Sequence, residues 1–532
     1  CADEPSQTAV PACAEDRPSG RSPAGDCPDV KLTPVKRKGL PMSLDPRTPV
    51  IVGVGQVNQR KESPDVEPVD LMAWAAREAA DPRVLEALDS IRVVNLLSWR
   101  YRDPGLLLGE RIGASASTTY SGIGGNTPQS MLNQACLDIQ QGRANAVLLV
   151  GGETWRTRMR LRAKGLRPEW TRQDETVAVP PGGEGSVPMS GPGEDRIGLD
   201  RPSYVYPMFD QALRIAEGES VDDHRHRIGR LWSQFSAVAQ ANPHAWSREA
   251  LSPEQIWRPG PDNRMISWPY PKLMNSNNMV DQSAAVVLCS VQKATYLQIP
   301  RDTWVFPHAG TDSHDTYGIA ERDELHRSPA IRIGAARVLE LAGVGVDDLD
   351  HVDVYSCFPS AVQVAAREIG LPEGDPARPL TVTGGLTFAG GPWNNYVMHS
   401  IATLTELLRE SPGARGLITA NGGYLTKHSF GVYSATPPSG AFRWEDVQQA
   451  VDAEPTRTAL VQWDGIGTVE SWTTPYDRDG NPEKAFLAVR TPDGSRTLAL
   501  IDDPDQAAQT VTEDIAGAAV RVRPDGRASL QT

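Results

Sequence analysis

The chain has 532 residues, of which 39% are hydrophobic and 23% charged, and its formal net charge is −14 at pH 7. This composition is typical of a globular protein with several domains, and the acidic balance argues against nucleic acid as a partner. The longest apolar runs, residues 146–150 and 283–289, are far shorter than the ~20 residues that span a bilayer. We therefore expect a cytoplasmic protein without a membrane span.

Residues 1–41 are rich in Pro, Ala, Ser and charge and lack apolar periodicity, which predicts a disordered N-terminal extension before Met42. The chain has six cysteines, and none belongs to a CxxC pair. The three beyond this extension, Cys136, Cys289 and Cys357, are widely spaced. This pattern predicts buried free thiols and no metal site.

Between residues 42 and 436, apolar strand-like runs alternate with amphipathic helical runs, which predicts an α/β domain. The expected strands cover residues 49–56, 91–97, 144–152, 283–290, 351–356, 414–420 and 430–434. The expected helices cover residues 70–80, 128–142, 329–343 and 395–411. In the second helix, the apolar residues that share one face, as a buried stripe does, are Leu132, Ala135, Cys136 and Ile139.

Two distant segments share one pattern of glycine loop, helix and strand. The first runs from Gly124 to Gly152 and the second from Gly390 to Gly423, and each begins and ends with a Gly-Gly pair. The repeat predicts a duplicated fold in which both glycine loops face one cleft. Helix N-termini would direct free N–H groups at that cleft.

Two further regions interrupt and extend this core. Residues 153–281 contain a basic run, a Gly/Pro-rich stretch and one amphipathic helix, and we interpret them as an inserted loop domain that shapes the substrate site. In residues 437–532, short alternating runs begin at residue 458 and are separated by Asp-Gly turns at 479, 493 and 525. This pattern predicts an antiparallel β-barrel.

These segments resemble the thiolase superfamily. NSNNMVDQSAAVVLCSVQKA (275–294) is similar to the thiolase NxxDGAAAxVLxS segment, and YSCFPS (355–360) occupies the place of the HDCF or NEAF motif. GGLTFAGGPWNNY (384–396) lies where thiolases carry GGxxxxGHPxGxxG. The sterol-carrier-linked branch is the most similar, and the C-terminal region resembles that of mycobacterial thiolase-like proteins. The resemblance implies an α/β thiolase fold: a duplicated five-layered αβαβα core with a loop domain, then the β-barrel.

The catalytic side chains of the family are absent at the matching positions. The nucleophilic cysteine of a thiolase falls on Gly125, the histidine of GHP on Gly391, and the second cysteine near Thr419 or Ala420. The Asn or His of the oxyanion hole falls on Tyr355. Because the family's reaction needs a thiolate at a helix N-terminus, the sequence predicts binding without cysteine-dependent thiolysis.

Two side chains remain as catalytic candidates. Tyr355 either donates a hydrogen bond to a developing oxyanion or packs as an aromatic in the space left by the family's residue. His428, with Lys427 beside it, is expected in a glycine-flanked loop, as an acid/base or as a surface residue. The backbone N–H groups predicted to bind the substrate carbonyl belong to Gly124, Gly125, Asn126, Gly390, Gly391, Asn421, Gly422 and Gly423.

The resemblance implies three alternative functions. The first is an acyl-CoA-binding protein, named by homology as an acetyl-CoA acetyltransferase, with a coenzyme A thioester as ligand and no resident cofactor. The second is a cysteine-independent aldol lyase or another acyl-CoA-transforming enzyme that uses Tyr355 and His428. The third is a regulatory or scaffold partner of another thiolase-fold subunit, so the chain is a monomer or pairs with such a partner. The basic run at 156–167 either meets a coenzyme A phosphate or is a solvated face, and we favour the latter.

Overall fold

The computed structural model describes residues 44–182 and 187–531. The predicted N-terminal extension, residues 1–41, lies outside these ranges. None of the described helices is both long enough and apolar enough to cross a membrane.

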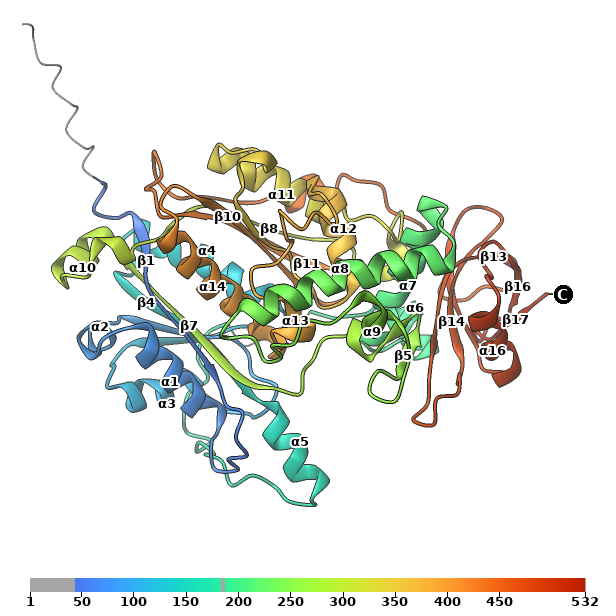
Figure 1. Cartoon of the computed structure of the whole chain (residues 1–532), viewed down its shortest axis with the longest axis horizontal. Coiled ribbons are helices and arrows are strands. Elements are labelled where there is room, and N and C mark those ends of the chain that lie inside the picture. Colours follow the sequence, from blue (N-terminus) through green and yellow to red (C-terminus); the bar gives the residue numbers. More distant parts are fainter. Residues whose placement is uncertain (1–43, 183–186, 532) are drawn as a thin grey trace, which may run out of the picture. The chain divides into compact units, whose positions relative to one another are not determined.

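The first sheet combines four strands from the start of the core with one that returns after a long excursion (Figure 1). Its order is β1-β7-β4-β2-β3; β2 is parallel to β3 and β4, and β7 is antiparallel to β1 and β4. The strands are β1 (Pro49–Asn58), β2 (Ser90–Val93), β3 (Ser117–Tyr120), β4 (Ala146–Thr154) and β7 (Asp281–Ser290). The helices of this part are α1 (Pro68–Ala79), α2 (Pro82–Glu86), α3 (Pro104–Ile112) and α4 (Thr127–Gln140).

The second sheet repeats this arrangement. Its order is β12-β8-β11-β10-β9, so β8, β11, β10 and β9 correspond to β1, β7, β4 and β2 of the first sheet. The strands are β8 (Phe306–His314), β9 (His351–Asp353), β10 (Arg415–Gly422), β11 (Lys427–Ser434) and β12 (Arg443–Asp446). The helices are α10 (Val291–Tyr296), α11 (Pro329–Ala342), α12 (Pro359–Ile369), α13 (Gly385–Phe388) and α14 (Tyr396–Glu410).

Helices α4 and α14 form a layer between the two sheets (Figure 1). Alternate strand residues enter two hydrophobic clusters: Val50 and Leu148 pack toward α1 and α3, whereas Val147 and Val286 pack toward α4 and the second half. On the far side, α11 covers β8 and β11. The predicted duplicated, five-layered α/β core is therefore confirmed.

The loop region between β4 and β7 contains the helices α5 (Trp155–Ala163), α6 (Pro192–Ile197), α7 (Pro202–Glu217), α8 (Val221–Ala241) and α9 (Pro253–Trp257), and the strands β5 (Met265–Trp268) and β6 (Tyr270–Pro271). The predicted amphipathic helix is α8, which buries Ile228, Leu231 and Phe235.

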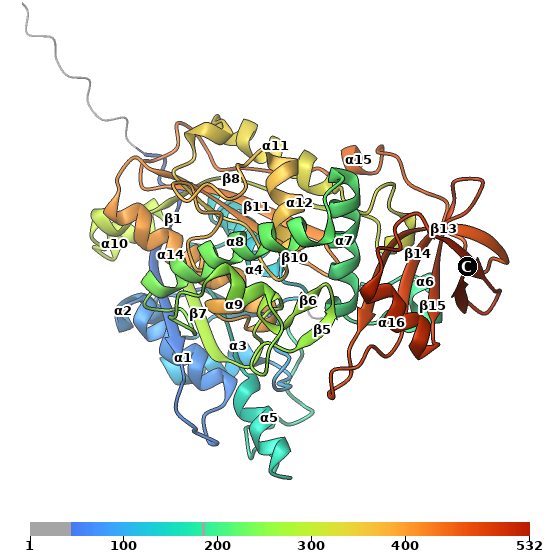
Figure 2. The same ribbon diagram turned by 45° about the vertical axis from the view of Figure 1, so that its right-hand side comes forward.

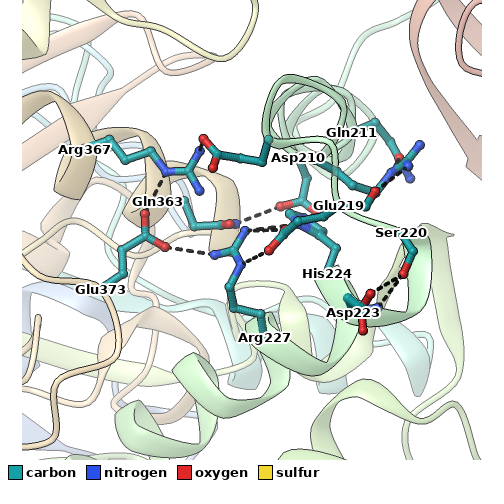
Figure 3. Close-up of polar contacts among 12 residues, drawn as sticks. Asp210, Gln211, Glu219, Ser220, Asp223, His224, Arg227, Gln363, Arg367 and Glu373 are labelled. Carbon is teal, nitrogen blue, oxygen red and sulfur yellow. Dashed lines mark hydrogen bonds and ion pairs between the residues drawn. The ribbon is translucent and has the colours of Figure 1, made fainter.

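An ion-pair network joins α7 and α8 to α12 (Figure 3). The imidazole of His224 lies 2.5 Å from Glu219 and 3.1 Å from Asp210. Arg227 pairs with Glu219 (2.8 Å) and with Glu373 (2.9 Å) beyond the end of α12. Burial alone would lower the pKa of His224, but the two carboxylates raise it above its usual value. The network thus favours the protonated form of the imidazole, which lies between two acidic side chains.

The C-terminal region is an antiparallel sheet with the order β15-β14-β13-β16-β17 (Figure 2). Its strands are β13 (Gly465–Pro475), β14 (Ala485–Arg490), β15 (Arg496–Ile501), β16 (Ala519–Val522) and β17 (Ala528–Leu530), and its helices are α15 (Gln448–Val451) and α16 (Pro504–Thr512). The sheet curls so that its two ends approach each other: the Leu500 N–H on β15 donates to the Gly526 carbonyl just before β17 (2.8 Å). The three Asp-Gly turns place Gly480, Gly494 and Gly526 at positive φ, as such turns require.

Two details of this region differ from the sequence-based expectation. The run that begins at residue 458 forms no strand until Gly465. Helix α16 was not expected; Asp503 caps it by accepting from the Gln506 N–H (3.0 Å), and Pro504 fits its first turn.

Candidate functional site

Three segments meet at the N-terminal end of α4: the glycine loop 124–126, the end of β10, and the turn before α14. The Gly124 N–H donates to the Asn394 side chain (3.1 Å), which itself donates to the Asn95 carbonyl (2.9 Å). A Cβ built on Gly422 would lie only 3.1 Å from the Gly125 nitrogen. Two of the predicted loops, 124–126 and 421–423, therefore meet at this helix start, with Asn394 of the turn after the second loop beside them. The predicted Gly124 donor is not free, because its N–H is bonded to Asn394.

The start of α4 is fixed locally. The Gly124 carbonyl accepts hydrogen bonds from the Thr127 N–H (3.1 Å) and from its hydroxyl (2.8 Å), and Pro128 lies in the first turn. The Gly125 N–H is buried and has no hydrogen-bond partner among the described residues. A buried N–H at a helix N-terminus is a donor that a carbonyl or anionic oxygen can accept.

The side-chain position of Gly125 is already occupied by other atoms. A Cβ there would overlap the Tyr355 hydroxyl and lie 2.8 Å from Tyr355 Cζ and 2.5 Å from the Asn421 carbonyl oxygen. Protein interiors are close-packed, and a rigid carbonyl cannot move aside cheaply. Packing thus requires glycine at this position, and Tyr355 fills the space that a nucleophilic side chain would take.

Tyr355 is held by its backbone and by a second aromatic ring. Its N–H donates to the Thr419 hydroxyl (2.9 Å), and its ring meets Tyr396 edge-on at 5.5 Å. Burial, with the nearby Cys357, raises the pKa of Tyr355 well above its usual value. The phenol is therefore neutral, and its hydroxyl has no hydrogen-bond partner within the part of the chain that the structure describes.

The turn after β10 is fixed by Tyr206, which comes from α7. The Tyr206 hydroxyl accepts from the Asn421 side chain (2.9 Å) and the Leu425 N–H (2.8 Å), and it donates to the Gly423 carbonyl (3.1 Å). Tyr206 also stacks on Phe358 at 4.5 Å. The loop region thus positions one of the three glycine segments.

The second glycine loop is tied to the segment before β7. The Gly391 N–H donates to the Asn277 carbonyl (2.9 Å), and the Gly391 carbonyl accepts from the Asn278 side chain (2.7 Å). Gly390 has φ +106°, and a Cβ there would overlap the Gln282 amide. At Gly391 the nearest atom to such a Cβ would be 3.4 Å away, so this position has room.

His428 lies on strand β11, not in the glycine-flanked loop expected from the sequence. Along β11, odd-numbered residues face α4: Ser429 accepts from Asn133 of α4 (3.2 Å), and Tyr433 donates to Gln129 of α4 (2.7 Å). His428 points the other way and lies 3.5 Å from Asp315, which caps the start of α11. The structure therefore places Tyr355 and His428 on opposite faces of the second sheet.

Lys427, next to His428, faces the glycine loop. Its ammonium donates to the Ile123 carbonyl (2.5 Å) and would lie 2.8 Å from a Cβ at Gly124. Burial lowers its pKa, and no carboxylate lies within ion-pair distance among residues 44–182 and 187–531. The Lys427 ammonium group thus lies beside the glycine loop without a described acidic partner.

The three described cysteines are buried and free. Cys357 is the one beside the site, with its sulfur 3.7 Å from the Asn421 side-chain nitrogen. Burial raises the pKa of Cys357 to about 12, so the thiol is protonated at neutral pH. In the described ranges, no group of three or more His, Cys, Asp or Glu side chains is arranged to hold a metal ion.

Comparisons with known proteins agree with this architecture. Residues 446–527 match the family model of the thiolase-like protein type 1 additional C-terminal domain. The crystal structure of a monomeric SCP2-thiolase-like protein type 1 from Mycobacterium smegmatis is 32% identical, with a TM-score of 0.78, and the match covers 92% of this chain and 100% of that one. The chain belongs to this SCP2-thiolase-like protein type 1 family. A search of curated proteins found no match.

More distant structures share the fold of this thiolase-like protein. Human mitochondrial 3-ketoacyl-CoA thiolase is 16% identical with a TM-score of 0.52, over 74% of this chain and 100% of that one. The Ltp2–ChsH2(DUF35) aldolase is 17% identical with a TM-score of 0.54, over 73% of this chain and 98% of that one.

Sequence reasoning identified the glycine loops but missed residues that the fold brings to them. Tyr206 is far from the loops in sequence, and nothing in its helical pattern distinguishes it from a core aromatic. Asn394 stands in the quoted GGPWNNY segment, where an Asn before a helix could have been read as a loop-binding side chain. Lys427 was noted only as the neighbour of His428, although strand alternation places the two on opposite faces.

Proposed function

We propose that this thiolase-like protein binds acyl-coenzyme A thioesters at its glycine loops and does not carry out cysteine-dependent thiolysis or Claisen condensation. One observation carries the proposal: the helix start that would activate a nucleophile is present, but Tyr355 and the Asn421 carbonyl fill the space of the nucleophile at Gly125. The nearest thiol, Cys357, is protonated because its pKa is about 12.

Binding is supported by the polar groups that remain. The unpartnered Gly125 N–H, the Tyr355 hydroxyl and the Lys427 ammonium are donors around one helix N-terminus, and together they favour a thioester carbonyl oxygen. Human mitochondrial 3-ketoacyl-CoA thiolase, which shares the fold at 16% identity, has been solved in complex with CoA.

The test compares binding with turnover in the purified chain. Titration calorimetry with acetyl-CoA and longer acyl-CoAs is expected to show saturable binding, and a thiolysis assay with acetoacetyl-CoA is expected to show no turnover. Lys427→Met should weaken acetyl-CoA binding, whereas Lys272→Met, in a short turn elsewhere in the loop region, is the matched control. Thiolysis that disappears in Cys357→Ala would contradict the proposal, and so would the absence of acyl-CoA binding.

A second candidate function is a cysteine-independent lyase for β-hydroxyacyl-CoA. One observation favours Lys427, in place of His428, as the partner of Tyr355. Tyr355 and Lys427 both border the glycine loop, whereas His428 faces Asp315 on the other side of the sheet. Proton transfer would therefore involve Tyr355 and Lys427. If β-hydroxyacyl-CoA is cleaved, Tyr355→Phe should abolish the cleavage and His428→Gln should retain it; the reverse pattern would remove this candidate.

A further inference from the structure

A pocket with three arginines among its seven lining residues lies at the edge of the first sheet, beside β3. Its volume is about 310 Å³. The two irregular segments 100–102 and 172–179 enclose it together with the last residue of β3. The lining residues are Arg100, Tyr101, Arg102, Tyr120, Arg172, Gln173 and Val179.

The pocket concentrates positive charge in an acidic protein. Three of its lining residues are arginines and none is acidic, although the whole chain carries a net charge of −14. Arg100, Arg102 and Arg172 form no ion pair within 4.0 Å among the residues that the structure describes. Asp174 lies close enough to Arg102 to feel its charge, but beyond ion-pair distance. Because no carboxylate pairs directly with the three like charges, an anion that enters between them lowers their mutual repulsion.

The walls of the pocket are fixed before any ligand binds. The Gln173 side chain accepts from the N–H groups of Arg102 and Asp103, each at 2.8 Å. The buried Glu67 accepts from the Tyr101 hydroxyl (2.7 Å) and the Thr171 N–H (2.9 Å). Both segments are thereby anchored to the core, and little ordering is required when an anion binds.

The Arg172 guanidinium is positioned by aromatic side chains. Arg172 lies over the ring of Trp99 at 5.8 Å, and Trp99 meets Trp170 edge-on at 5.3 Å. The tyrosine hydroxyls of the pocket are already engaged: Tyr101 donates to Glu67, and Tyr120 accepts from the Leu96 N–H (2.9 Å). The Arg102 Nε is also engaged, because it donates to the Val177 carbonyl (2.7 Å), which leaves its two terminal nitrogens for a ligand. The guanidinium groups are therefore the recognition elements, while the tyrosines form the walls.

From this geometry we propose that the pocket binds phosphate groups. Guanidinium forks match the oxygens of a phosphate in pairs, and several of them together favour a multiply charged anion over a single carboxylate. The pocket is also close to the glycine loop along the chain. Tyr120 precedes Gly124 by four residues, which is about 14 Å at full extension.

The short separation suggests that the phosphate groups belong to coenzyme A, an assignment that rests on the proposed function. The pantetheine arm of coenzyme A is long enough to join a thioester at Gly125 to a nucleotide at the arginines. Inorganic pyrophosphate or a free nucleotide would present the same chemistry without the thioester. The experiment therefore treats the phosphate site and the coenzyme A assignment separately.

Titration calorimetry of the full chain with inorganic pyrophosphate tests the site itself. Each Arg→Gln change at Arg100, Arg102 or Arg172 is expected to weaken binding about tenfold, because one charge-assisted contact is lost. Arg478→Gln is the matched control, an exposed arginine without an ion pair in the described ranges. If the Arg102→Gln or Arg172→Gln variant unfolds at a lower temperature than the native chain, the test relies on Arg100→Gln, because the Arg100 side chain has no hydrogen bond with the described residues. Failure of pyrophosphate to bind, or equal binding by native and variant chains, would overturn the proposal.

A second titration compares coenzyme A with S-acetyl-N-acetylcysteamine, a thioester without a nucleotide. If the pocket holds the coenzyme A phosphates, the arginine variants weaken coenzyme A and leave the short thioester unchanged. If pyrophosphate depends on the arginines but coenzyme A does not, the phosphate site stands and its assignment to coenzyme A is wrong. If the native chain binds pyrophosphate but not the short thioester, the result contradicts the proposed function and leaves the phosphate pocket standing.

Discussion

The two glycine loops of the duplicated core stand at equivalent places, and each precedes a helix of the middle layer, yet they are filled differently. In the first loop, the side-chain position of Gly125 is closed by Tyr355 and by the Asn421 backbone carbonyl. In the second loop, Gly390 is closed by the flexible Gln282 amide, while Gly391 has room for a Cβ. The first loop thus has no space for a side chain at residue 125, whereas the second loop has space at residue 391.

This difference indicates which of the two loops could accept a side chain at its second glycine. A histidine at Gly391 would meet no atom closer than 3.4 Å at its Cβ, whereas a cysteine at Gly125 would collide with a backbone carbonyl. The helix start and the buried Gly125 N–H are present, whereas a side chain at residue 125 has no space.

Among the glycine positions, the largest expected effect is at the first loop. Gly125→Ala should destabilise the chain by about 3 kcal/mol, because the added Cβ meets the Tyr355 ring and the Asn421 carbonyl, and the carbonyl belongs to a central strand. Urea denaturation measures the change. Combining it with Tyr355→Phe should recover only part of the loss, since the carbonyl contact remains. Full stability of Gly125→Ala would show that the closed first loop is not a packing constraint.

The next effect is at Gly390. Gly390→Ala should cost about 2 kcal/mol, because φ +106° is unfavourable for residues with a Cβ and the Gln282 amide must move. Gln282→Ala in the same background should relieve the contact but not the backbone strain. A double-mutant cycle on urea midpoints separates the two contributions, and a cycle without any coupling would contradict the proposed contact.

The sequence predicted the type and order of the core elements well, because each has a strong and local signal. The apolar stripe of α4, with Leu132 and Ile139 fully buried, and the continuous buried run of β7 are two examples. The glycine-before-helix pattern also located both loops correctly.

The contacts that decide the site were beyond the reach of the sequence. Tyr355 meets Gly125 only because the segment after β9 and the loop before α4 come together in the folded core, and Tyr206 reaches Asn421 across the loop region. The orientation of His428 was misjudged because the strand was expected to begin at residue 430, whereas β11 begins at Lys427. Strand boundaries depend on pairing with neighbouring strands, so a sequence pattern can miss them by three residues. Such a shift leaves the strand itself correctly predicted, but it decides whether Lys427 or His428 faces the site.

The middle-layer helix α14 should make the stability of the chain depend on pH. His399 on α14 is buried, and burial lowers its pKa from the usual 6.5 to about 3. In the unfolded chain the imidazole gains its proton near pH 6.5, so stability is full above that pH and falls as the pH drops toward 3, by up to about 1.4 kcal/mol per pH unit. His399→Gln should flatten this slope in urea titrations between pH 7 and pH 4. An unchanged slope would mean that His399 is protonated or hydrated in the folded chain.

The smallest expected effect is at the open position of the second loop. Gly391→Ala should change stability by no more than about 0.5 kcal/mol, and in the stabilising direction, because the Cβ meets ordinary contacts and alanine restricts the unfolded chain. The same measurement on Gly125→Ala provides the matched contrast. If Gly391→Ala lowers the free energy of unfolding as much as Gly125→Ala does, residue 391 has no more space for a side chain than residue 125. If it is neutral, Gly391→His becomes the informative variant, since it would return a side chain to the second loop, while thiolysis should still be absent without a nucleophile at Gly125.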